Sequence, residues 1–315
     1  MLASALAACG DDGGGEESAS RLDAVEISGE FGASPTVDWK SRMTAGKPEA
    51  ESIVKGEGAE LKKDDKVYVN FWVGNGYTQK ATFDTFGPES PASVITIGGP
   101  PAQPQTVEDV IAQFLSTEVK AGVTRGTRLA VTVGATDLFG QNVGAEPVAQ
   151  ADIGKDDSLL VIADVLDVEP LDKVEGESTP GPAWAPEVVL KKDVPTGLDF
   201  RGTPALGDKL KVATLVEGTG EEVEKGDLLI ANYLGVVYRG TKPFDESFTK
   251  PAPLERGIGL GQLVKGWDQG LVGKKVGSRV LLGIPPRLGY GKQGQPPTIP
   301  ANATLFFVID ILGTV

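Results

Sequence analysis

Histidine is absent from this chain of 315 residues, and Cys9 is its only cysteine. Acid/base catalysis by an imidazole, Ser/His/Asp and Cys/His triads, and the usual zinc sites are therefore excluded by composition. The sequence predicts no metal site. Any chemistry that this protein performs must use other groups.

Positive charge and long apolar runs are also scarce. Lys and Arg together number 30 against 44 Asp and Glu, which gives a net charge of -14. No basic stripe is available for a phosphate backbone, so we expect no nucleic-acid partner. No segment approaches the roughly 18 consecutive apolar residues of a membrane-spanning helix. Contact with a membrane is expected only through an anchor.

The first ten residues are apolar and small, like the end of a secretory signal. Leu6-Ala7-Ala8-Cys9 resembles the lipobox of bacterial lipoproteins, which implies lipidation of Cys9 and a position on the outer face of the cell membrane. Most of a signal peptide is missing, so we expect the start to lie upstream or the chain to be trimmed. The alternative is a chance Ala-rich leader with an inert thiol.

The length suits two domains, each able to bury its own core. Residues 10 to 20 contain Gly, Asp, Glu and Ser, and they are expected to form a flexible tether. Residues 22 to 37 are expected to form one or two loosely attached strands. A Pro/Gly/acidic segment at 171–186 predicts a linker. The predicted domains are therefore 21–170 and 187–315, called the first and second domain below, after a leader and tether at 1–20.

The two domains look like copies of one another. Matching features occur in the same order: Phe83-Asp84 with Phe244-Asp245, Gly126-Thr127-Arg128 with Gly277-Ser278-Arg279, Phe139-Gly140 with Tyr290-Gly291, and Asp164 with Asp310 in the last strands. Such order indicates an internal duplication with a period too long for a solenoid.

Most of the second domain is predicted to be short strands, with one helix. The apolar run between Gly277 and Pro286 is typical of a buried strand. Leu263, Trp267 and Leu271 recur every four residues, which is the spacing of one helical face, and Gly273 offers a stop signal.

These residues resemble a known family. The second domain is similar to FKBP-type peptidyl-prolyl cis/trans isomerases over nearly all of 210–313. The fold class implied is α+β: two tandem FKBP-like domains, each an antiparallel sheet of five or six strands wrapped over one short helix. The matching motifs are Asn232-Tyr233, Pro243-Phe244-Asp245, Leu263-Val264-Lys265-Gly266-Trp267, Leu288-Gly289-Tyr290-Gly291 and Ile299-Pro300-Ala301-Asn302.

The implied activity needs no histidine and no cofactor. Rotation about an Xaa-Pro bond faces a barrier of about 18 to 20 kcal/mol from amide resonance. A dry apolar pocket disfavours the charge-separated resonance form and so favours the twisted transition state. A thousandfold acceleration needs about 4 kcal/mol, within reach of desolvation and one or two placed hydrogen bonds.

The resemblance implies roles for specific residues. Four would act at the twisting bond: Asp245, Tyr290, Val264 and Trp267. Of these, Trp267 would lie under the proline ring, the Val264 N–H and the Tyr290 hydroxyl would bind substrate carbonyls, and Asp245 would accept a hydrogen bond from Tyr233. The other substrate-binding residues would be Tyr233, Phe244, Leu254, Leu263, Thr298, Ile299 and Phe307.

Both domains depart from the family pattern. Lys250 replaces an Arg that usually pairs with the Asp, and an ammonium cannot make the two-bond contact of a guanidinium. In addition, Leu254 replaces a frequent Phe, and Gln295 and Thr298 replace a His and an Ile. In the first domain the aligned pocket residues are Phe71, Phe83, Asp84, Phe114 and Phe139, while an ungapped count puts Ser116 at the Trp position. We expect the first domain to be a weak or inactive isomerase, or a holding or spacing module.

Two functions remain open. One is an anchored, monomeric prolyl isomerase that assists the folding of exported, proline-containing polypeptides and is a possible target of the family's macrolide inhibitors. The other is a chaperone or envelope interaction module that binds proline-containing segments without turnover. The joint presence of Tyr290, Asp245 and Trp267 favours the first, whereas Lys250 and the degenerate copy leave room for the second.

Overall fold

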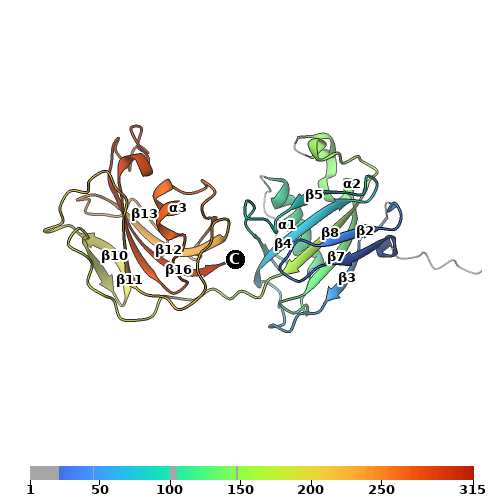
Figure 1. Cartoon of the computed structure of the whole chain (residues 1–315), viewed down its shortest axis with the longest axis horizontal. Coiled ribbons are helices and arrows are strands. Elements are labelled where there is room, and N and C mark those ends of the chain that lie inside the picture. Colours follow the sequence, from blue (N-terminus) through green and yellow to red (C-terminus); the bar gives the residue numbers. More distant parts are fainter. Residues whose placement is uncertain (1–20, 45, 100–103, 105, 147) are drawn as a thin grey trace, which may run out of the picture.

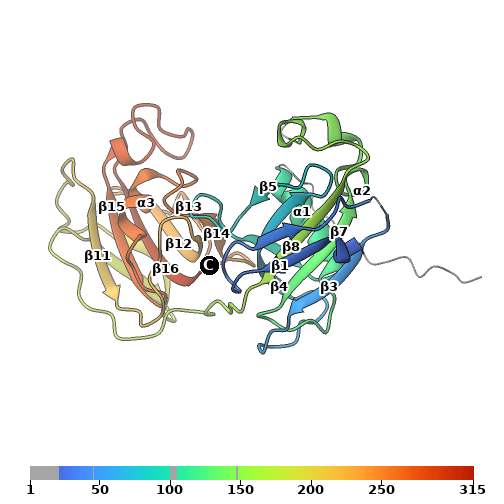
Figure 2. The same ribbon diagram turned by 45° about the vertical axis from the view of Figure 1, so that its right-hand side comes forward.

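The computed structural model describes residues 21–44, 46–99, 104, 106–146 and 148–315, so Cys9 and the predicted leader and tether lie outside the described residues. Two similar units lie side by side, and a single stretch of chain joins them along one side (Figure 1). Turning the molecule brings β14, defined below, into view between the two units (Figure 2). No described helix is long and apolar enough to cross a membrane.

The described residues of the first domain form eight strands, two α-helices and three 3-10 helices. Its strands are β1 (Val25–Ser28), β2 (Thr36–Trp39), β3 (Glu49–Val54), β4 (Lys66–Asn75), β5 (Lys80–Asp84), β6 (Ser93–Thr96), β7 (Arg128–Gly134) and β8 (Ser158–Val165). Its helices are η1 (Arg21–Ala24), α1 (Val107–Glu118), α2 (Ala135–Phe139), η2 (Gly140–Gly144) and η3 (Ala149–Ala151).

The second domain repeats this plan with one α-helix. Its strands are β9 (Glu187–Lys191), β10 (Val194–Asp199), β11 (Lys211–Val216), β12 (Leu228–Val237), β13 (Asp245–Glu246), β14 (Leu254–Gly257), β15 (Arg279–Ile284) and β16 (Leu305–Thr314). Its helices are α3 (Lys265–Leu271) and η4 (Pro286–Leu288).

The two main sheets share one topology. The first runs β3-β7-β8-β4-β5 with β6 also paired to β4, and the second runs β11-β15-β16-β12-β13 with β14 also paired to β12. All these pairs are antiparallel, and a register shift occurs at the same place in both, between Ser52 and Val54 and between Thr214 and Val216. An irregularity repeated in position supports the predicted duplication, because independent sheets have no reason to share it.

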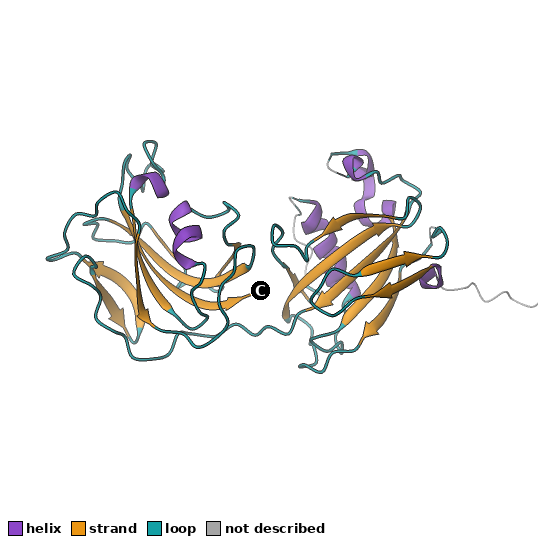
Figure 3. Ribbon diagram, viewed as in Figure 1, coloured by secondary structure: helices purple, strands orange, loops and turns teal. Residues whose placement is uncertain are grey.

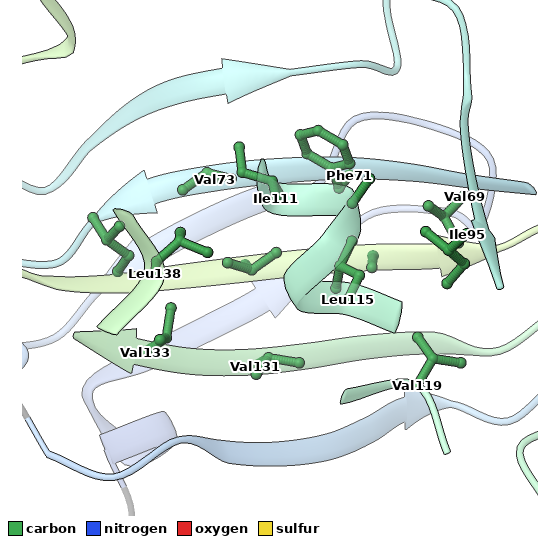
Figure 4. Close-up of a cluster of buried hydrophobic side chains, with 14 of the residues drawn as sticks. Val69, Phe71, Val73, Ile95, Ile111, Leu115, Val119, Val131, Val133 and Leu138 are labelled. Carbon is green, nitrogen blue, oxygen red and sulfur yellow. The ribbon is translucent and has the colours of Figure 1, made fainter. Parts of the chain in front are cut away.

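A helix packs on one face of each main sheet (Figure 3). In the first domain Thr106 caps α1 through a reciprocal capping box with Asp109, and the helix buries Ile111 and Leu115, which are four residues apart. These side chains meet the strand residues in a continuous apolar core, and Ile111 lies beside Phe71 of β4 (Figure 4).

The single α-helix of the second domain is shorter and sits close to the sheet. A Cβ at Gly266 would lie 2.6 Å from the Ile284 side chain of β15, so only glycine permits this approach. The helix buries Trp267 and Leu271 as predicted, but it begins at Lys265, so Leu263 lies just before it. Gly273, with φ of +80°, follows the end of the helix.

The other face of each main sheet is covered by a hairpin. β1 pairs with β2, and β9 pairs with β10. The first hairpin is held more tightly than the sequence suggested. Arg128 is 1% exposed and pairs with Asp164 at 2.5 Å, while its Nη2 donates to the carbonyl of Ala33 and the N–H of Gly32 donates to Asp164. A buried ion pair needs such extra hydrogen bonds to offset its desolvation.

The second domain uses the matching pair for the same purpose. Arg279 donates two hydrogen bonds to Asp310, at 2.6 and 2.7 Å, and a third to the carbonyl of Asp193 in the β9–β10 turn. Burial raises the pKa of Asp310, and the bonds from Arg279 oppose that rise. In each copy, a buried Arg–Asp pair on neighbouring strands of the main sheet thus holds the N-terminal hairpin in place.

The two domains contact each other directly. A cluster of buried apolar residues joins Tyr68, Ala92 and Leu166 of the first domain to Leu228, Ile230 and Leu312 of the second. Beside it, Glu255 of β14 accepts hydrogen bonds from Lys66, at 2.7 and 2.6 Å, and from the Tyr68 hydroxyl at 2.9 Å. Burial and then the neighbouring Glu255 raise the pKa of Tyr68. The first domain is therefore attached to an edge strand of the second.

Candidate functional site

A cavity of about 620 Å³ opens on the face of the second sheet that α3 covers. Fifteen residues line it: Tyr233, Phe244, Asp245, Leu254, Gly261, Gln262, Leu263, Val264, Lys265, Trp267, Arg287, Gly289, Tyr290, Gly291 and Phe307. The motifs singled out in the sequence thus meet in one place, although they come from β12, β13, β14, α3, β16 and the turn after η4.

Aromatic rings form the floor of this cavity. The ring of Trp267 meets those of Tyr233 and Phe307 edge to face, each with centroids 5.4 Å apart. Phe244 packs in the same way on Phe307, at 5.5 Å. Edge-to-face packing fixes each ring by its neighbours. The result is a rigid apolar surface whose shape does not depend on a ligand.

The carboxylate of Asp245 lies at the rim and is held by three donors. The Tyr233 hydroxyl donates to Oδ2, while the Lys250 ammonium and the Glu246 N–H donate to Oδ1, each at 2.9 Å. Lys250 thus pairs with the Asp through one nitrogen, which is the single contact expected from an ammonium. Burial would raise the pKa of Asp245, but the bonds from Tyr233 and Lys250 together lower it below its ordinary value.

Besides the buried Trp267 Nε1–H, which has no partner, two donors in the cavity have no acceptor among the described residues. Neither the Tyr290 hydroxyl nor the Val264 N–H makes a hydrogen bond to any residue that the structure describes. Val264 precedes α3 in extended conformation, so its N–H is not used by the helix. Burial and then the charge of Asp245 raise the pKa of Tyr290, which keeps the hydroxyl a donor. Both groups are available to an acceptor in the cavity.

The structure does not bring Thr298 and Ile299 to the cavity wall. Gln295 forms a β-bridge with Ile299, and the closed loop directs the Ile299 side chain into the core, where it is 1% exposed. Thr298 lies at the exposed tip and donates a weak hydrogen bond to the Gln295 carbonyl at 3.3 Å. The remaining nine predicted residues in the second domain all line the cavity.

The lining also contains three polar residues that were not predicted as site residues: Gln262, Lys265 and Arg287. Gln262 and Lys265 flank the Leu263-Val264 pair, so their position next to this motif could have indicated that they lie at the site. Arg287 lies in η4, which folds back over the cavity, and its Nε donates to the carbonyl of Asp208. All three are exposed, which places them at the rim.

The residues at the corresponding positions of the first domain pack in its core. Phe71 is 0% exposed and Phe139 is buried in the core, with Phe83 and Phe114 packed against it. Ile111 of α1 lies beside Phe71 (Figure 4). Phe114 is only partly buried, and the Ser116 hydroxyl donates to the Gln113 carbonyl. Asp84, which has no tyrosine to bind, accepts a hydrogen bond from the Ser34 hydroxyl at 2.6 Å.

Comparison with known proteins places the second domain in a family. The model of the FKBP-type peptidyl-prolyl cis-trans isomerase family matches residues 219–312. The chain is 41% identical over 107 residues to FK506-binding protein 1A of Neurospora crassa, a match that covers 34% of this chain and 88% of the relative. It is 42% identical over 103 residues to an FK506-binding protein of Neisseria meningitidis, covering 33% and 94%.

Other relatives match over a smaller share of their length. Peptidyl-prolyl cis-trans isomerase FKBP15-2 of Arabidopsis thaliana is 48% identical over 91 residues, covering 29% of this chain and 55% of the relative. Among solved structures, FkpA from Escherichia coli is 37% identical, with a TM-score of 0.31 and coverage of 33% and 47%. Because almost the whole length of two relatives aligns at more than 40% identity, the chain belongs to the FKBP-type peptidyl-prolyl cis-trans isomerase family.

Proposed function

We propose that the second domain is the isomerase of this protein and that it acts on Xaa-Pro bonds of exported polypeptides. The observation that carries the proposal is the pairing of a rigid aromatic floor with two donors, the Tyr290 hydroxyl and the Val264 N–H, that have no acceptor in the described structure. Such donors are suited to bind the carbonyl groups of a substrate.

The reaction requires no covalent step. A proline ring on Trp267 leaves the preceding peptide bond in a mostly apolar cavity, where the charge-separated resonance form is disfavoured. The carbonyls on either side of that bond then accept hydrogen bonds from the two donors, which hold the chain while the bond rotates. Lowering the barrier by about 4 kcal/mol corresponds to a thousandfold acceleration.

Asp245 acts on the substrate through the electrostatic effect of its fixed carboxylate. Its negative charge faces the rotating carbonyl carbon, and the bonds from Tyr233 and Lys250 keep the carboxylate ionised and fixed. An electrostatic group that is already oriented costs no reorganisation during the reaction. The single-nitrogen contact of Lys250 holds it less firmly than a guanidinium would.

The assignment to the second domain can be tested in the full chain with matched variants. Asp245→Ala is expected to lower kcat/KM for a short Leu-Pro peptide by roughly tenfold or more, because it removes both a charge and the partner of Tyr233. Asp84→Ala is the same change at the matching position of the first domain, and it is expected to leave kcat/KM unchanged. An equal loss in both variants would show that the first domain is also an isomerase.

The same experiment distinguishes catalysis from binding alone. If the intact chain turns over the peptide no faster than buffer but still binds it, measured by anisotropy of a labelled peptide, the protein is a binding module. Several relatives are named FK506-binding proteins. We therefore expect this macrolide to compete with the peptide for the cavity, and Trp267→Ala to weaken both ligands.

We also propose that the protein works at the outer face of the cell membrane, held by a lipid on Cys9. The proposal rests on Leu6-Ala7-Ala8-Cys9 and on the Gly/Asp/Glu/Ser segment that follows it. Mass spectrometry of the protein from its native membranes tests this directly. An acylated Cys9 at the N-terminus is the expected result, and an unmodified Met1 would contradict it.

A further inference from the structure

A second cavity lies between the two domains and continues the first. It measures about 620 Å³ and is lined by Thr85, Glu89, Ser90, Pro91, Ala92, Ser93, Val94, Thr106, Glu108, Asp109, Ala112, Leu228, Glu255, Arg256 and Gln262. Gln262 lines both cavities. In β14, Leu254 lines the aromatic cavity and the next residue, Glu255, lines the interdomain cavity. A polypeptide that leaves the aromatic floor past Gln262 therefore enters this interdomain cavity.

Two sheet edges border the interdomain cavity. Within the described residues β6 pairs with β4 alone and β14 pairs with β12 alone. Ser93 and Val94 of β6 and Glu255 and Arg256 of β14 line the cavity from opposite domains. An edge strand is a place where an extended segment can add as a further strand. On β14 the Gly257 N–H already donates to the Gln262 side chain, and the Glu255 carbonyl accepts from Arg256.

The charges around the interdomain cavity are mostly negative. Four carboxylates line it, against the guanidinium of Arg256. Glu255 is already paired with Lys66, and Asp109 accepts the N–H of Thr106 in the capping box. The side chains of Glu89 and Glu108 are exposed, so they carry most of the charge that a ligand would meet.

The walls of the interdomain cavity are held in place by close contacts. A Cβ at Gly226 would lie 2.1 Å from the carbonyl oxygen of Pro88, and one at Gly257 would lie 3.1 Å from Pro91. The loop that carries Glu89 is thus pressed against the backbone of the second domain. Preformed walls bind a flexible segment at a lower cost than walls that must first be ordered.

We propose that the interdomain cavity binds the part of the client polypeptide that flanks the proline in sequence, in extended form and with basic side chains toward Glu89 and Glu108. This assignment rests on the proposed function of the aromatic cavity. It makes the first domain a specificity-determining part of the enzyme, although that domain lacks the two tyrosine hydroxyls of the aromatic cavity.

The test compares peptides that share one Leu-Pro core in the full chain. One peptide is short, one is extended on both sides with lysines, and one is extended with glutamates. The intact protein is expected to show a kcat/KM roughly three- to tenfold higher for the lysine peptide than for the glutamate peptide, since each exposed ion pair contributes a modest factor. High salt is expected to reduce the difference.

The double variant Glu89→Gln with Glu108→Gln is expected to lose most of this preference while it keeps the intact rate on the short peptide. The control is Glu146→Gln with Asp156→Asn, which removes the same charge from exposed residues of the same domain outside the cavity lining. Persistence of the preference in the first double variant, or an equal loss in the control, would overturn the proposal.

The two hypotheses fail in different ways. Turnover of the short peptide tests the proposed function by itself, because that peptide does not reach the interdomain cavity. If turnover is absent, the Kd of the labelled lysine peptide still tests the cavity. A Kd that does not change between the intact chain and the Glu89/Glu108 variant would then refute the assignment.

Discussion

Hydroxyl groups distinguish the two copies of this fold at the level of single residues. Tyr233 and Tyr290 stand where the first domain has Phe71 and Phe139. In the second domain the Tyr233 hydroxyl orients Asp245, and that of Tyr290 faces the cavity without a protein acceptor. In the first domain both Phe side chains belong to the core. The first domain therefore lacks both hydroxyls at these positions.

Tyr290→Phe tests the role of the free hydroxyl. We expect kcat/KM to fall roughly fivefold, which corresponds to about 1 kcal/mol for one hydrogen bond made in the transition state. Thermal stability should not change, because no bond inside the described structure is lost. Tyr238→Phe is the matched control: its hydroxyl donates to the Thr203 carbonyl at 3.0 Å, so stability should fall while the rate is kept.

Because Asp245 stays charged, we predict that kcat/KM does not vary with pH near neutrality. The lowered pKa of this carboxyl means that it stays ionised down to pH values below the ordinary Asp value of about 3.9. The raised pKa values of Tyr233 and Tyr290 keep both hydroxyls protonated, and the chain has no histidine. We expect kcat/KM on the short peptide to be constant from about pH 5 to 9. An inflection between pH 5 and 8 would show that another group takes part.

At the scale of elements, each domain adds an N-terminal hairpin to its main sheet. The β9–β10 hairpin lies outside residues 219–312, which match the family model. In both copies an Arg from the second-last strand of the domain in sequence, β7 or β15, and an Asp from the last, β8 or β16, form a buried pair that also bonds the hairpin. The duplicated unit thus included the hairpin and the Arg–Asp pair that holds it.

Arg279→Ala is expected to destabilise the second domain by about 3 to 5 kcal/mol, because Asp310 is left buried without its partner. Hydrogen exchange of β16 amides should then accelerate strongly, while that of β8 amides changes little. Arg128→Ala should give the reverse pattern, since it leaves Asp164 unpaired in the first domain. Equal acceleration in both strands would show instead that the two sheets unfold as one unit.

At the scale of the whole molecule, the first domain is a neighbour of the active cavity rather than a distant spacer. It bonds Glu255 on the strand that carries Leu254, and it supplies the opposite wall of the interdomain cavity. The apolar cluster between the domains adds a non-directional attraction to these bonds. The two domains together border an interdomain cavity that shares Gln262 with the aromatic cavity.

Gly226→Ala is predicted to separate the domains. The new Cβ would lie 2.1 Å from the Pro88 carbonyl oxygen, so the first domain has to move. We expect a larger radius of gyration by small-angle X-ray scattering, with the short-peptide rate retained. Gly273→Ala is the control for backbone strain: its φ is also positive, at +80°, but no atom lies within 4 Å of the added Cβ. An equal change in both variants would contradict the proposed contact.

Much of the fold and of the candidate site could be predicted from the sequence. The alternation and spacing of apolar residues predicted the strands and the helix that buries Trp267 and Leu271, because periodicity is a local property. Paired landmarks such as Arg128 and Arg279 predicted the duplication. Nine of the residues assigned by resemblance line one cavity, since motifs in a family keep their place in the fold.

Other features depend on contacts between residues far apart in the chain. The turn of Ile299 into the core, the packing of Ile111 beside Phe71 and the tight hold on the first hairpin follow from packing that no local pattern encodes. The same holds for Gln262 as the link between two cavities and for Glu255 as the bridge to Lys66. The sequence alone indicated the family, the duplication and nine of the residues that line the cavity. The tertiary structure decided which side chains face the cavity and how the domains meet, because those depend on the simultaneous packing of both domains.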